Sequence, residues 1–70
     1  MVNQIAELMH ASPFKPFVLV VSGGIKTRVP HLDYIFLHPE RTTVSVAVPG
    51  GAFRILNVAQ IIAIETKAVA

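Results

Sequence analysis

The spacing of apolar residues changes once along the chain, from a helical period to an alternating one. In the first segment the apolar residues are Val2, Ile5, Leu8 and Met9. Their intervals of three and four residues place them on one face of a helix. Asn3 is the expected N-cap, and the prolines of SPFKP end the pattern because neither they nor the residues before them suit a helix. We therefore predict one short helix over residues 2–11.

After these prolines, apolar residues recur with a period of two, which is typical of β-strands. The stretch FVLVVSGGIKTRV indicates two strands joined by a turn, because Gly23 and Gly24 tolerate the positive φ angles of a hairpin. The first strand is apolar on both faces, so we expect it to be covered on both sides. In the second strand Lys26 and Arg28 alternate with Ile, Thr and Val, which predicts a half-exposed strand.

The rest of the chain predicts four more strands separated by turn residues. They are expected over residues 34–37, 42–48, 53–56 and 61–65. The second of them has the clearest alternation, with Val44, Val46 and Val48 on one face. The segment NVAQ interrupts the last two strands and fits a single 3₁₀ turn. Residues 67–70 are expected to form a tail.

These elements predict an α+β chain that is mostly β. We expect one domain over residues 1–70, with a short N-terminal helix followed by a five- to six-stranded antiparallel small barrel over residues 17–66. Too few residues remain for crossover helices, so the strands must pair in antiparallel fashion. A strongly twisted sheet of this size bends into a barrel and so hides its edges.

The composition adds an imbalance to this picture. Of the 70 residues, 53% are hydrophobic and 14% are charged, against averages of about 45–50% and about 25% in globular proteins. A small domain has a high surface-to-volume ratio, so the surplus apolar surface is expected to lie in contacts between chains. We predict a homo-oligomer held by strand edges and apolar faces. The expected interface residues are Val18, Val20, Val44, Val46, Ile61 and Ile62.

The compartment is inferred from what the sequence does not contain. There is no cysteine, so disulfides and thiolate metal sites are excluded. The longest apolar run, residues 17–21, is far shorter than the roughly 20 residues of a membrane-spanning helix. The N-terminus lacks the basic and apolar regions of a signal peptide. We therefore expect a cytoplasmic protein with no membrane partner.

Basic residues are the first candidates for binding chemistry. Lys26 and Arg28 share a strand face, and Arg54 is a third candidate. In a ring of subunits they would form a basic rim able to hold the phosphates of a nucleic acid. The alternative is a solvated outer face that also protects an edge strand from pairing. A net charge of only +2 is a weak footprint for nucleic acid.

Metal binding and catalysis have fewer candidates. His31 and Asp33 stand two residues apart, as do His38 and Glu40, and each pair has the spacing of a chelate on a strand. Zinc requires three or four ligands, so both pairs would have to converge. The alternative is that all four are polar residues of strand ends and turns. No serine stands in a nucleophile-elbow context, so we predict no enzyme activity, no catalytic residue and no cofactor.

The order of the expected elements resembles the Sm-like (SH3-like) small barrels, the family of bacterial Hfq and the Sm proteins. The stretches that carry the resemblance are VLVVSGGIKTRV and RILNVAQIIAIE. It implies a barrel fold and RNA binding, with Tyr34 and Phe36 as the candidate base-stacking residues. The Lys-His pair that contacts uridine in the family's RNA chaperone would fall near Leu56 and Asn57, where neither residue type stands. PFKPFVLVVSGG and IIAIE are also similar to segments of small uncharacterised bacterial proteins.

The leading prediction is therefore a non-enzymatic, self-associating module for protein interaction or assembly, whose protein partner the sequence does not identify. The first alternative is an Sm-like ring that binds RNA through Lys26, Arg28 and Arg54. The second alternative is a metal site at His31, Asp33, His38 and Glu40.

Overall fold

The computed structural model describes residues 1–66, which form one helix, six strands and two 3₁₀ turns. The helix α1 spans Val2–Met9. The strands are β1 (Phe17–Val21), β2 (Ile25–Val29), β3 (Ile35–Leu37), β4 (Thr43–Val48), β5 (Ala52–Asn57) and β6 (Ile61–Thr66). The 3₁₀ turns are η1 (Leu32–Tyr34) and η2 (Val58–Gln60), and η2 confirms the turn predicted at NVAQ. The tail predicted over residues 67–70 lies outside the described residues.

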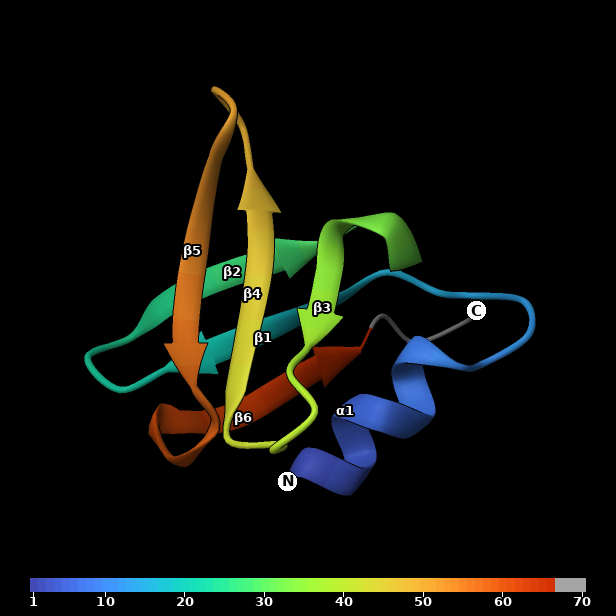
Figure 1. Cartoon of the computed structure of the whole chain (residues 1–70), viewed down its shortest axis with the longest axis horizontal. Helices are drawn as coiled ribbons and strands as arrows, with labels where there is room; N and C mark the ends of the chain where they lie inside the picture. Colours follow the sequence, from blue (N-terminus) through green and yellow to red (C-terminus); the bar gives the residue numbers. More distant parts are fainter. Residues whose placement is uncertain (67–70) are drawn as a thin grey trace.

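The strands form two three-stranded antiparallel sheets. The first sheet has the order β2-β1-β6 and the second sheet has the order β3-β4-β5. The strands of the second sheet cross in front of those of the first (Figure 1). The mostly-β class, the antiparallel pairing and the strand number are confirmed. The two sheets do not join into one closed ladder, so the structure does not confirm the barrel.

The hydrophobic core lies between the two sheets. Strands β1, β2 and β4 bury alternate residues, as the period of two requires. In β6 the inward residues Ile61 and Ile64 are three apart, because the register with β1 shifts between Val20 and Val21. In β4, Val44 and Val46 are fully buried, and in β1, Leu19 is fully buried. The complete cluster consists of Ile5, Met9, Phe17, Leu19, Val29, Ile35, Val44, Val46, Leu56 and Ile61. The inward and outward positions predicted for β4 are therefore confirmed.

The helix α1 contributes to this core from one end of the sheets. It lies beside β3 and β6 (Figure 1). Ile5 is completely buried and Met9 nearly so, while Leu8 packs against the same cluster. The predicted apolar helix face is therefore confirmed. Within residues 1–66, no helix has the length and apolar character needed to cross a membrane.

The predicted helix start at residue 2 is confirmed, but the predicted N-cap and the predicted C-terminal end are wrong. The helix begins at Val2 with Met1 as the N-cap, so Asn3 lies inside the first turn and does not cap it. Its Oδ1 atom instead accepts a hydrogen bond of 3.1 Å from Nη2 of Arg41. The helix ends at Met9 rather than at residue 11, and the N–H of His10 bonds to the carbonyl oxygen of Ala6.

The first strand is covered less evenly than predicted. Phe17 and Leu19 point inward and are buried, whereas Val18 and Val20 point outward and are half-buried. The outward face of the first sheet also carries Lys26 and Arg28 on β2, opposite Val20 and Val18. The strand is therefore fully covered on its core side and only partly covered on the other. The predicted half-exposed character of β2 is confirmed.

Truncating the helix side chain at the centre of the core should destabilise the whole domain. We expect Ile5→Ala to lower the free energy of unfolding by about 2–5 kcal/mol, because it removes buried methyl groups and leaves a cavity. Ile62→Ala is the matched control, because that side chain is 61% exposed, and it should cost less than about 1 kcal/mol. Urea unfolding followed by circular dichroism measures both. Equal, small effects would show that α1 is not part of the core.

Candidate functional site

The second sheet presents an apolar face to solvent. Phe53 and Ile55 are 71% exposed and Phe36 is 57% exposed, and the first two are the most exposed large apolar side chains within residues 1–66. Cross-strand register places Phe36 and Ile55 on either side of Ser45. We call the outward positions of this sheet the outer face; they are Phe36, His38, Thr43, Ser45, Ala47, Phe53, Ile55 and Asn57. None of these eight residues is Asp, Glu, Lys or Arg.

The size of the side chains on the outer face differs from strand to strand. The central strand β4 supplies only small side chains to it, namely Thr43, Ser45 and Ala47. The flanking strands supply the large ones, Phe36 from β3 and Phe53 with Ile55 from β5. Large side chains therefore form a ridge on each side of a shallow valley. Strand β5 is also an edge of its sheet, so one side of its backbone is not paired within the sheet.

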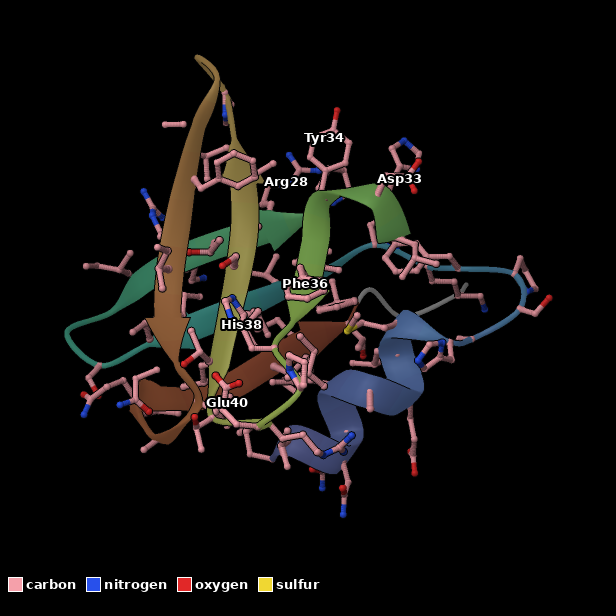
Figure 2. All side chains as sticks on the ribbon, viewed as in Figure 1. Arg28, Asp33, Tyr34, Phe36, His38 and Glu40 are labelled. Carbon is pink, nitrogen blue, oxygen red and sulfur yellow. The ribbon has the colours of Figure 1, made fainter. Side chains whose placement is uncertain are left out.

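A hydrogen bond links the side chains of two residues of this face. Nε2 of His38 lies 2.8 Å from Oγ of Ser45 in a partly buried hydrogen bond. The edge of the His38 ring contacts Phe36, with 5.0 Å between ring centroids. Oε1 of Glu40 lies 3.9 Å from Nδ1 of His38, and Figure 2 shows these side chains following one another along the β3 end of the sheet. The imidazole is therefore hydrogen-bonded to a hydroxyl group and packed against an aromatic ring, and an exposed carboxylate lies nearby without bonding to it.

A serine, a histidine and a carboxylate in this order also suggest nucleophilic catalysis. Acyl transfer additionally needs N–H donors aimed at the developing oxyanion. Around Ser45 the backbone of β4 is paired on one side with β3 and on the other with β5, so its N–H groups are used in the ladders. The arrangement therefore favours a structural role for the hydrogen bond between Ser45 and His38.

The three basic residues selected from the sequence lie around one groove. Lys26, Arg28 and Arg54 all line an open groove of about 720 Å³, together with Tyr34. Tyr34 is 42% exposed, and Figure 2 shows its ring next to Arg28. The groove lies where β2, an edge of the first sheet, approaches β5, an edge of the second. Sequence distance conceals this proximity, because Lys26 and Arg54 are 28 residues apart.

Arg54 is the most firmly held of these groups. Its Nη1 atom lies 2.9 Å from Oγ1 of Thr27 and 3.4 Å from the carbonyl oxygen of Lys26. Thr27 is only 1% exposed and is the one buried polar residue of the described chain. Arg54 therefore satisfies a buried hydroxyl group and ties the edge of one sheet to the edge of the other.

The other two basic residues are freer. Lys26 forms an ion pair of 3.3 Å with Glu65, but both side chains are more than half exposed, and such surface pairs contribute little to stability. Arg28 forms no ion pair within residues 1–66. Its guanidinium group is therefore the one with most remaining capacity to bind an anion in the groove.

The metal candidates do not gather into one site. His31 and Asp33 lie at η1, whereas His38 and Glu40 lie at the other end of β3. The part of the chain that the structure describes contains no group of three or more histidine and carboxylate side chains able to hold a metal ion. His31 instead packs against the ring of Tyr34, with 5.9 Å between ring centroids.

The expected interface residues need a correction. Val44 and Val46 are fully buried and Ile61 is 5% exposed, so these three belong to the core of their own chain. Val18 and Val20 are half-buried, and Ile62 is exposed. The apolar residues that do reach solvent together are Phe36, Phe53 and Ile55. Sequence reasoning missed the last two because every residue from 53 to 56 except Arg54 is apolar, which hides the inward and outward positions.

Comparisons with protein-family models, with curated proteins and with solved structures found no match. The resemblance to the Sm-like small barrels therefore stays a prediction.

Removing the Arg54 side chain should leave the Thr27 hydroxyl group without its partner. We expect Arg54→Met to lower the free energy of unfolding by about 1–2 kcal/mol, which is the cost of an unsatisfied buried polar group. Adding Thr27→Val should recover part of this loss, because the orphaned hydroxyl group is then absent. Arg28→Met is the matched control and should change stability by less than about 0.5 kcal/mol. Equal losses from the two arginine variants in urea unfolding would contradict this role of Arg54.

Proposed function

We propose that this chain is a self-associating interaction module whose outer face binds the outer face of a second copy. The observation that carries the proposal is the uncovered, uncharged face of the second sheet, with Phe53 and Ile55 at 71% exposure. Contiguous apolar patches of this kind mark interaction sites on small proteins. The class of function is assembly, without a chemical reaction.

The chemistry of the face favours a copy of itself as the partner. Since none of its eight residues carries a permanent charge, two copies meet without repulsion between like charges. The shape of the outer face is also complementary to itself. In a two-fold arrangement the ridge of Phe53 and Ile55 on one copy would lie over the valley of Ser45 and Ala47 on the other. Sheets packed in this way lie about 10 Å apart, as in a β-sandwich.

The small size of the domain gives an energetic reason for self-association. A chain of 70 residues supplies only a marginal core, and small domains commonly gain stability from a partner subunit. Fully burying a Phe or Ile side chain contributes about 1.5–3 kcal/mol. Covering the exposed parts of Phe36, Phe53 and Ile55 on both copies would therefore offset part of the entropy lost when two chains associate.

The strand order, with a 3₁₀ turn before β6, supports an Sm-like barrel as the architecture of each copy.

A charge placed on the ridge should prevent association. We expect Ile55→Lys to weaken self-association at least about 30-fold, because a central apolar contact is replaced by an ammonium group that must stay hydrated. Ile25→Lys is the matched control, because Ile25 is 54% exposed but lies on β2, outside the outer face. Sedimentation equilibrium over a range of concentrations gives the dissociation constants. A wild-type protein that is monomeric throughout, or equal effects of the two variants, would contradict the proposal.

A second candidate function is binding of single-stranded nucleic acid in the groove. The observation that favours it is the convergence of Lys26, Arg28 and Arg54 with an exposed aromatic ring, Tyr34. Proteins that bind single strands combine cationic side chains for the phosphates with aromatic rings on which bases stack. Arg54 is already oriented by Thr27, so less freedom is lost when it binds a phosphate.

Binding to oligo-U RNA of about twelve nucleotides, a length within the usual site sizes, tests this function by fluorescence anisotropy across a salt series. We expect affinity to fall as salt rises, and Arg28→Gln to reduce the salt dependence by about one counterion. Tyr34→Leu should weaken binding by about 5- to 100-fold through lost stacking. Lys15→Gln removes one charge outside the groove and is the control. Salt-independent binding, or an equal loss in the Lys15 variant, would exclude the groove as the site.

A further inference from the structure

We propose that the protonation state of His38 controls the self-association: copies bind through their outer faces while the imidazole is neutral, and separate when it gains a proton. The inference rests on the proposed function, since it concerns regulation of the same face. It assigns a role to the only ionisable side chain among the eight outer-face residues.

The position of His38 makes a proton costly in the associated state. Its ring lies against Phe36 and is hydrogen-bonded to Ser45, in the valley strand that the second copy would cover. A neutral imidazole brings no net charge into that apolar contact. An imidazolium would have to lose much of its hydration when the copies meet, and burial of a charge is unfavourable unless it is well paired.

The groups around His38 do not supply such a pair. From β3 it meets Phe36, and from β4 it meets Ser45. The loop between these strands contributes Glu40 and Arg41. The Glu40 carboxylate is 3.9 Å away, which is beyond hydrogen-bonding distance, and its side chain is 57% exposed. The Arg41 guanidinium group is directed to Asn3 of α1.

Strand β5 adds no charge on this side. Its outward residues are Phe53, Ile55 and Asn57, whereas Arg54 is opposite the inward-facing Val46 and bonds to Thr27. A partly exposed pair of His38 and Glu40 at a separation of 3.9 Å contributes little to stability. The desolvation of two imidazolium rings per dimer therefore outweighs it. Association should release protons, and the dissociation constant should rise as the pH falls through the range in which histidines titrate.

Sedimentation at pH 7.5 and pH 5.5, at one ionic strength, tests the inference. We expect the dissociation constant of the wild-type protein to be at least tenfold higher at pH 5.5. His38→Gln keeps an acceptor for the Ser45 hydroxyl group but takes up no proton, so its constants at the two pH values should agree within twofold. His10→Gln and His31→Gln are the matched controls, because both histidines lie outside the outer face, and they should retain the wild-type pH dependence.

The outcomes separate the two proposals. A wild-type protein that is monomeric at pH 7.5 overturns the proposed function itself. A dimer with equal constants at both pH values, or a His38→Gln variant with unchanged pH dependence, overturns only the role of His38. If that variant does not fold, the wild-type dimer is diluted in buffers of different ionisation enthalpy. The heats of dilution then give the number of protons that the protein takes up when the dimer dissociates. Proton uptake of up to two per dimer is expected, and no uptake overturns the inference.

Discussion

Each three-stranded sheet has two faces, and residues 1–66 fully bury only one face of each. The two inner faces meet in a single apolar cluster, and the only helix of the described residues closes one end of that cluster with Ile5 and Met9. Among residues 1–66, no further helix or strand covers the outer face of the second sheet. Phe36, Phe53 and Ile55 are therefore exposed, and the second copy that we propose would cover them.

Few polar side chains are buried between the two sheets, and the one that is buried lies at a sheet edge. Thr27 is the one buried polar residue described, and Arg54 supplies its partner from the opposite sheet. Within residues 1–66 no buried side-chain nitrogen or oxygen lacks a hydrogen bond. The same contact fixes the guanidinium group of Arg54 beside Lys26. A link that holds the two sheets together therefore also builds one wall of the groove.

Strand positions followed from the sequence because alternation is a local property, and β4 shows this best. The inward set of β5 did not follow, since Ile55 and Leu56 are both apolar and only pairing with β4 decides that Leu56 points inward. The interface expectation failed for Val44 for a related reason: composition counts apolar residues without showing which ones the core uses. The sequence predicted the basic residues that line the groove but not the groove itself. The groove forms only where the edges of the two sheets meet in the folded chain.

Arg41 connects the loop after β3 to the N-terminal helix. Its backbone has a φ of 64°, which costs a non-glycine residue on the order of 1 kcal/mol. Its N–H bonds to the carbonyl oxygen of His38 at 2.8 Å, and its side chain bonds to Asn3. The loop thus joins the N-terminal helix to the backbone of His38. Through these two bonds the position of α1 and the backbone geometry at the end of β3 depend on the same residue.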